Sequence, residues 1–279
     1  MKKLAIILSL LTLGLFIGVC VLLYPAFSDY VNSKSQSRVV ARYVDDIAGM
    51  DDSKKQAMLA AARDYNQRLL YSENRFRPAD QDAAAYKQLL NTGRGVMGIL
   101  AIDKINVKLA IYHGTDEGNL QVGLGHMQGT SLPVGGPGTH ACITGHRGLP
   151  SSTLLSDLDR LTEGDSFVIY VMGETLTYRV DQIQTVEPQE VQSLGIDPDM
   201  DYCTLVTCTP YGVNSHRLLV RGRRTENALN AGWETVYAGA RHLDKPMAIL
   251  ICLIPALPLM LLLIILRGRK IRKGGIHHR

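Results

Sequence analysis

The sequence has 279 residues, of which 46% are hydrophobic and 20% are charged, and its formal net charge is +4 at pH 7. This length allows one or two domains with appended segments. Eight of the 30 cationic residues lie at the two ends, so residues 24–246 carry a net charge of −4. The overall positive charge is therefore no argument for a nucleic-acid-binding protein.

The N-terminus begins with Lys2 and Lys3, followed by an uncharged apolar run from Leu4 to Leu23. The run predicts a transmembrane segment or signal anchor over residues 1–27. A cleaved signal peptide is the alternative, because Ala26-Phe27-Ser28 resembles a cleavage site, although the run is long for a signal. Under either interpretation, we expect the residues that follow to be exported.

Residues 28–94 are more polar, and we expect one or two helices between about 33 and 70. Asp51-Asp52-Ser53 is typical of a helix start, and apolar residues follow it at helical spacing. The segment is interpreted as an extracellular helical stalk that ends in a loop over 71–82.

From Val96 onward, short β-type runs are separated by glycines and other turn residues. Runs of this kind predict a mainly β domain over 95–224, folded as a sandwich or a closed barrel. We expect at least seven strands and a short helix over 153–161. The predicted strands cover residues 98–103, 107–112, 139–144, 166–171 and 175–180, and the segments before and after the turn that follows Cys208.

The C-terminal part begins with an expected linker helix over 225–246. The uncharged run Met247–Leu266 follows, and its 20 residues predict a second transmembrane helix. The tail over 267–279 is basic, as is the N-terminus. The positive-inside rule therefore places both termini in the cytoplasm and the domain between them outside, with the tail lying against anionic membrane lipids.

The five cysteines do not form the pattern of a disulfide framework. Cys142 and Cys203 lie in predicted strands; they could pair, but two buried thiols are favoured. Cys208 differs because it ends a strand, where a thiol can be exposed. The histidines lack the spacing of zinc ligands, so we expect neither a metal nor a cofactor.

Three side chains have the chemistry that acyl transfer through a thioester requires. Cys208 is the candidate nucleophile, which reacts as a thiolate. His146, which follows the strand over 139–144, is the candidate acid and base because an imidazole titrates near neutrality. Arg217, which begins the strand paired with that of Cys208, is the candidate oxyanion stabiliser. Without a catalytic role, Cys208 would be a small core residue, His146 a hydrogen-bonded histidine and Arg217 a surface cation.

The segments around these residues resemble the motifs of a known family. Thr204-Leu205-Val206-Thr207-Cys208, Thr144-Gly145-His146 and Arg217 resemble the cysteine, histidine and arginine motifs of the sortases, membrane-anchored cysteine transpeptidases of Gram-positive bacteria. Residues 111–115, 123–136 and 145–150 are similar to class C, the pilin-polymerising branch. The resemblance covers residues 95–224 strongly and 28–94 loosely.

The resemblance implies an eight-stranded sortase-type β-barrel on the extracellular face of the cell membrane. It also implies that Cys208 cleaves a Leu-Pro-x-Thr-Gly sorting signal between Thr and Gly, and that a pilin lysine resolves the thioester. The residues that the resemblance places in the substrate groove are Thr130, Ser131, Leu132, Pro133 and Thr207.

The resemblance further implies a lid in the N-terminal loop, in which an Asp-Pro pair precedes an aromatic residue that covers the cysteine. This chain has Arg77-Pro78-Ala79 instead, with Phe76 out of register. We therefore expect the 71–82 loop to be displaced from the groove or held by other contacts, and Cys208 to be accessible. The alternative is that Phe76 or Tyr71 fills the groove from a shifted register.

Two other functions remain as hypotheses. One is a housekeeping-type sortase that anchors surface proteins to cell-wall peptidoglycan or its precursor, and the second apolar run argues against it. The other is a non-catalytic, membrane-tethered pilus assembly factor, and the presence of Cys208, His146 and Arg217 argues against that.

Overall fold

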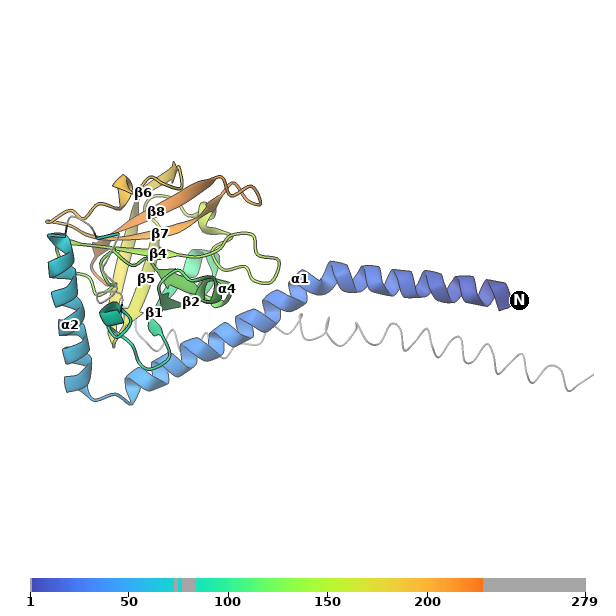
Figure 1. The fold of residues 1–279 in the computed structure, drawn as a ribbon, viewed down its shortest axis with the longest axis horizontal. Helices are drawn as coiled ribbons and strands as arrows, with labels where there is room; N and C mark the ends of the chain where they lie inside the picture. Colours follow the sequence, from blue (N-terminus) through green and yellow to red (C-terminus); the bar gives the residue numbers. More distant parts are fainter. Residues whose placement is uncertain (1, 73–74, 77–83, 228–279) are drawn as a thin grey trace, which may run out of the picture. The chain divides into compact units, whose positions relative to one another are not determined.

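The computed structural model describes residues 2–72, 75–76 and 84–227 (Figure 1). Of the described residues, 2–31 belong to one compact unit and those from 32 to 227 belong to another. The helices are α1 (Lys2–Ala48), α2 (Asp52–Leu70) and α4 (Glu117–Val122), with 3-10 turns η1 (Asp103–Ile105), η2 (Leu158–Arg160) and η3 (Gln192–Leu194). The strands are β1 (Val96–Ile102), β2 (Val107–His113), β3 (Leu124–His126), β4 (Thr139–Thr144), β5 (Ser166–Val171), β6 (Glu174–Val186), β7 (Asp201–Thr209) and β8 (His216–Thr225).

The first half of α1 is an apolar helix with exposed side chains. The portion Leu13–Ala48 is long and apolar enough to include a membrane span. Leu15 and Leu22 are 71% and 80% exposed, which suits side chains that face lipid. The predicted C-terminal span over 247–266, the tail over 267–279 and nearly all of the linker helix lie outside the described residues.

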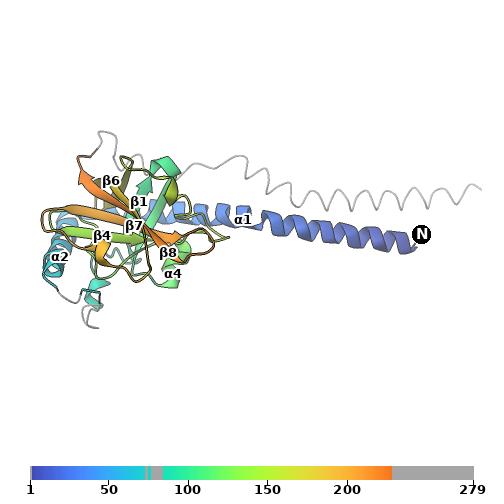
Figure 2. The ribbon, with the colours of Figure 1, turned by 90° about the horizontal axis from the view of Figure 1, so that it is seen from above.

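The eight strands close into a barrel in the order β1-β2-β3-β4-β7-β8-β6-β5. The pairs β2–β3 and β4–β7 are parallel, and the other pairs are antiparallel. Figure 2 shows β4, β7 and β8 running alongside one another, which brings the predicted cysteine, histidine and arginine segments together. The expectation of a mainly β, eight-stranded barrel with N-terminal helices is confirmed.

The helices of residues 32–70 pack on the barrel and do not form a separate stalk. Tyr43 of α1 is buried, and its hydroxyl donates to the carbonyl oxygen of Met97 at 2.9 Å. Asn66 of α2 forms two hydrogen bonds with the backbone of Leu132, at 3.0 and 2.7 Å. Asp51 caps α2 by accepting from the amide of Ser53 at 2.8 Å, as its sequence predicted.

Three elements differ from the sequence-based expectation. The short strand β3 was not predicted, and β6 runs on to Val186, beyond the expected end at residue 180. The helix expected over 153–161 is reduced to the single turn η2. Leu154 has a φ of 38°, which a right-handed helix excludes.

Candidate active site

Cys208 and Arg217 lie opposite each other on neighbouring strands. The antiparallel register of β7 and β8 pairs Cys208 with Arg217. Side chains of directly opposed residues lie on the same face of a sheet, typically with Cβ atoms about 5 Å apart. The partly exposed thiol therefore has a guanidinium as its cross-strand neighbour.

His146 reaches the same end of the barrel because two hydrogen bonds tie its neighbour Gly145 to β7. The amide of Gly145 donates to the carbonyl oxygen of Val206 at 3.1 Å, and the hydroxyl of Thr207 donates to the carbonyl oxygen of Gly145 at 2.8 Å. The parallel register pairs Thr144 with Val206, so His146 follows at the level of Cys208. The three predicted catalytic residues thus belong to one site.

Glu117 is a residue of this site that the sequence analysis missed. Its Oε1 lies 3.3 Å from Nε2 of His146. The hydrogen bond from Gln121 and the neighbouring His146 hold the pKa of the Glu117 carboxyl below its usual value. Glu117 and His146 are 29 residues apart on different elements, so no local pattern marked the pair.

The guanidinium of Arg217 is held by its own loop. Its Nη1 donates to the carbonyl oxygens of Asn214 and His216, at 3.2 and 3.1 Å. The other N–H groups of the planar fork form no hydrogen bond with the described residues. His216, its neighbour, instead contacts Glu187 at 3.3 Å.

Arg147, beside His146, joins the loop after β4 to the end of β7. Its side chain is 8% exposed and forms an ion pair with Asp159. Its Nη1 also donates to the hydroxyl of Thr209 at 3.3 Å, and its guanidinium lies 6.0 Å from the ring centroid of Tyr211. These contacts fix the loop that carries His146 against the strand that carries Cys208.

An apolar cluster continues the outward face on which Cys208 and Arg217 lie. Val206 and Leu219 are each two residues from the catalytic pair on the same strands, so their side chains share its face. They form the cluster with Cys142, Val186 and Leu194. These five residues form an apolar surface beside the Cys208–Arg217 pair.

The described part of the N-terminal loop lies on this cluster. Phe76 packs against it, and Nη2 of Arg75 donates to the carbonyl oxygen of Leu194 at 3.0 Å. A Cβ atom on Gly129 would lie 2.3 Å from the carbonyl oxygen of Arg75, so the contact depends on glycine. Residues 75–76 thus lie on the cluster, as in the alternative in which Phe76 packs from a shifted register, while Cys208 remains partly exposed.

In the family's lid motif the aromatic residue would fall at Ala79, so Phe76 reaches the cluster from a shifted register. The apolar ring of Phe76, one residue before Arg77, is partly buried on the cluster. Arg77, Pro78 and Ala79 lie outside the described residues. Their role in the lid region stays a prediction.

The residues that were expected to line the substrate groove are buried beneath its surface. Thr207 bonds the backbone of Gly145, and the hydroxyl of Ser131 accepts from the amide of His140 at 3.0 Å. In the structure these side chains are buried and make internal hydrogen bonds, so their place in a substrate groove stays a prediction. The buried residues are Thr130, Ser131, Leu132, Pro133 and Thr207.

The other two cysteines of the barrel are structural. Cys142 and Cys203 are free and fully buried, which confirms two thiols without a disulfide. Burial raises the pKa of Cys142 to about 12 and that of Cys203 well above its usual value. Within the described part of the chain, no group of three or more His, Cys, Asp and Glu side chains could hold a metal ion.

Comparison with known proteins places this geometry in a family. The model of the sortase domain matches residues 100–225. Sortase C1 of Streptococcus agalactiae is 46% identical, with a TM-score of 0.67 over 68% of this chain and 100% of that one. Sortase C of Streptococcus pneumoniae, which has pilin substrates, is 39% identical, with a TM-score of 0.62 over 68% of this chain and 97% of that one.

The similarity to curated relatives is more limited in extent. Sortase D of Bacillus subtilis is 27% identical over 130 residues, which are 46% of this chain and 63% of that protein. The chain thus spans less than two thirds of the length of this relative.

Proposed function

This chain belongs to the sortase family, and we propose that it is a class C transpeptidase that joins pilin subunits covalently outside the cell membrane. The observation that carries the proposal is the register that pairs Cys208 with Arg217, together with the bonds that tie the His146 segment to the same strand. A thiol, an imidazole and a guanidinium at one barrel end are the groups that thioester chemistry needs.

In the first half-reaction, the thiolate of Cys208 attacks the threonine carbonyl carbon of a Leu-Pro-x-Thr-Gly signal. The carbonyl oxygen gains negative charge, which the free N–H groups of Arg217 stabilise. His146 then protonates the glycine amine as the carbon–nitrogen bond breaks. The carbon–sulfur bond of a thioester remains.

In the second half-reaction, the side-chain amine of a lysine on another pilin subunit attacks the thioester carbonyl carbon. His146 accepts the proton that the amine loses. The carbon–sulfur bond breaks, Cys208 leaves as the thiolate, and an isopeptide bond joins the two subunits. No cofactor takes part in either step.

The apolar cluster with Phe76 is the groove for the leucine and proline of the signal. The Phe76 ring occupies this surface, so a substrate has to displace it. The apolar first half of α1 anchors the enzyme in the membrane, with both termini in the cytoplasm and the barrel on the outer face of a Gram-positive cell.

A direct test incubates the full-length protein, in membranes, with a pilin that carries a Leu-Pro-x-Thr-Gly tail. A ladder of covalent products on a denaturing gel is expected. A peptide that mimics the amine of a cell-wall precursor is added in a parallel reaction. Ligation to that peptide with no pilin ladder would contradict pilin polymerisation and favour cell-wall anchoring; no product of either kind would favour the non-catalytic assembly factor.

A further inference from the structure

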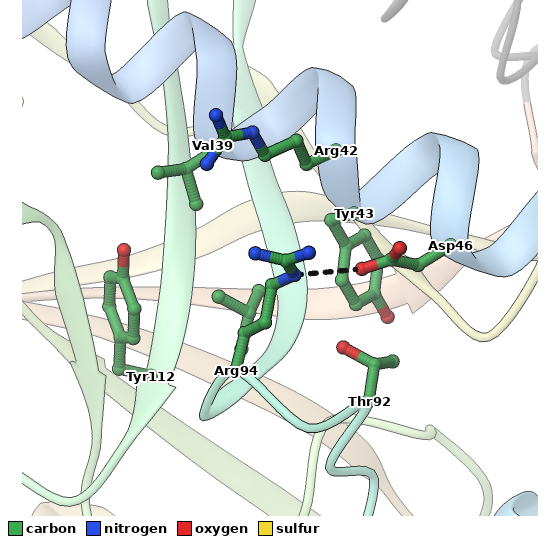
Figure 3. Close-up of a pocket in the computed structure, with 8 residues that line it drawn as sticks. Val39, Arg42, Tyr43, Asp46, Thr92, Arg94 and Tyr112 are labelled. Atoms are coloured by element: carbon green, nitrogen blue, oxygen red, sulfur yellow. Dashed lines mark ion pairs between the residues drawn. The ribbon is translucent and has the colours of Figure 1, made fainter.

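A small cavity lies between the second half of α1 and the segment that leads into β1 (Figure 3). Its volume is about 150 Å³, and none of the active-site residues line it. An apolar cavity of that size holds a molecule as large as benzene, so this one has room for a single small residue. The lining residues are Val39, Arg42, Tyr43, Asp46, Thr92, Arg94, Val96 and Tyr112.

The cavity presents hydrogen-bond donors that the protein itself does not use. Arg42 is exposed, and it forms no hydrogen bond or ion pair with any residue that the structure describes. The hydroxyl of Thr92 is buried without a hydrogen-bond partner among those residues. Tyr112 is half-buried, and its hydroxyl has no partner within the same described ranges either. Buried polar groups are normally hydrogen-bonded, so the buried hydroxyl of Thr92 points to a ligand, and the unpaired groups of Arg42 and Tyr112 lie beside it.

Asp46 and Arg94 add one charge of each sign. Oδ2 of Asp46 lies 3.4 Å from Nε of Arg94, which is an ion pair without a hydrogen bond. That oxygen is buried and accepts no hydrogen bond from the described residues. Figure 3 shows the two guanidinium groups at the cavity, one from α1 and one from the loop before β1.

The charge of the cavity selects the ligand. Arg42 and Arg94 against Asp46 leave one net positive charge, which a singly charged oxyanion neutralises. A guanidinium fork binds a carboxylate through two parallel bonds. The buried oxygen of Asp46 needs a donor, which an amide N–H beside the carboxylate supplies.

We propose that this cavity binds the C-terminal residue of a peptide, with its carboxylate at Arg42 and Arg94 and its amide N–H at Asp46. A phosphate dianion fits less well, because it would leave the site negatively charged beside Asp46. The bound residue connects α1 to the segment over 92–112, so it stabilises the packing of α1 on the barrel.

The test measures binding of N-acetylalanine to the full-length protein in nanodiscs by titration calorimetry. N-acetylalaninamide, acetate and inorganic phosphate are measured alongside. N-acetylalanine is expected to bind most tightly and to raise the unfolding temperature as its concentration rises. No binding of N-acetylalanine, equal binding of the amide, or tighter binding of phosphate would overturn the proposal.

The variants use residues whose side chains do not hold the fold together. Arg42→Gln removes an unpaired charge and is expected to weaken N-acetylalanine roughly tenfold or more. Tyr112→Phe keeps the ring and removes only the hydroxyl, so a smaller weakening is expected. Arg38→Gln, also exposed on α1 but outside the cavity, is the matched control. Affinity in Arg42→Gln equal to that of the control would refute the site.

Discussion

At the residue scale, Glu117 is the group that contacts the imidazole proposed as acid and base. It contacts Nε2 of His146 at 3.3 Å, and its own side chain is 68% exposed. Exposed ion pairs contribute little, because water and salt screen them. The carboxylate is therefore a positioning group with a modest effect.

Glu117→Gln is expected to lower kcat/KM about two- to fivefold, the range of an exposed ion pair. The loss should fall mainly on kcat, because Glu117 acts through His146. Steady-state transpeptidation measures it. Asp116→Asn, which changes the adjacent carboxylate, should behave as wild type; an equal loss in both variants would remove Glu117 from the site.

Gly145 has a structural reason to be glycine. A Cβ atom there would lie 2.6 Å from Cδ2 of Leu124 and 3.0 Å from Cδ1 of Leu155. Gly145→Ala is expected to lower the free energy of unfolding by about 1–3 kcal/mol, the cost of overpacking, and to displace His146.

Denaturant unfolding and turnover of Gly145→Ala check this prediction together. Gly118→Ala is the control, because a Cβ at Gly118 meets nothing within 4 Å. Wild-type stability and activity in Gly145→Ala would mean that the chain relaxes freely around the added methyl group.

The candidate catalytic residues could be named from the sequence because each lies in a short contiguous motif at a strand end. Predicting Cys208, His146 and Arg217 required only the alternating pattern of the strands and the chemistry of the three side chains. Glu117 and the buried state of Thr130 depend on how distant segments pack. No local pattern carries that information.

At the scale of elements, the N-terminal loop packs its Phe76 ring against the outward face of β7 and β8. The strands were predicted well from the sequence where apolar and polar residues alternate over many positions. The sequence analysis missed β3, which has three residues, because so short a run has no period to detect. It predicted the docking of Phe76 only as an alternative, because the apolar cluster that receives the ring is assembled from five separate segments.

Phe76→Ala is expected to accelerate alkylation of Cys208 by a small thiol reagent, because the ring covers the surface beside the thiol. Single-turnover labelling followed by mass spectrometry measures the rate. Tyr71→Ala is the control, since Tyr71 is 83% exposed. The same rate in Phe76→Ala and wild type would show that the ring does not limit access.

At the scale of the whole molecule, two buried neutral histidines link stability to pH. Burial lowers the pKa of both His126 and His140 to about 4. His126 contacts the hydroxyl of Tyr86 at 2.8 Å, and His140 contacts the hydroxyl of Thr204 at 2.7 Å. Through these contacts the two histidines connect the segment after the N-terminal loop to the barrel, and β4 to β7 within it.

The sign of the pH dependence follows from these values. Above pH 6.5 both histidines are neutral in the folded and the unfolded chain. Between pH 6.5 and 4 the unfolded chain binds protons that the folded chain does not, so stability falls as pH falls. At pH 4.5, each histidine is expected to lower the free energy of unfolding by about 2 kcal/mol relative to its value above pH 6.5.

Thermal unfolding of the full-length protein in detergent at pH 7 and pH 4.5 checks this expectation. The unfolding temperature should drop at the lower pH, and less so in His126→Gln. His216→Gln is the control, because its side chain is 42% exposed. An unfolding temperature that does not change with pH would contradict the assignment of buried neutral histidines.

The central claim is that Cys208 carries the acyl group. The most direct measurement is intact-mass analysis after the full-length protein is mixed with a Leu-Pro-x-Thr-Gly peptide and quenched in acid. We expect an adduct with the mass of the peptide up to threonine, mapped to Cys208, retained in Cys142→Ala and Cys203→Ala, and absent from Cys208→Ala. An adduct on another residue, or one that persists in Cys208→Ala, would contradict the account.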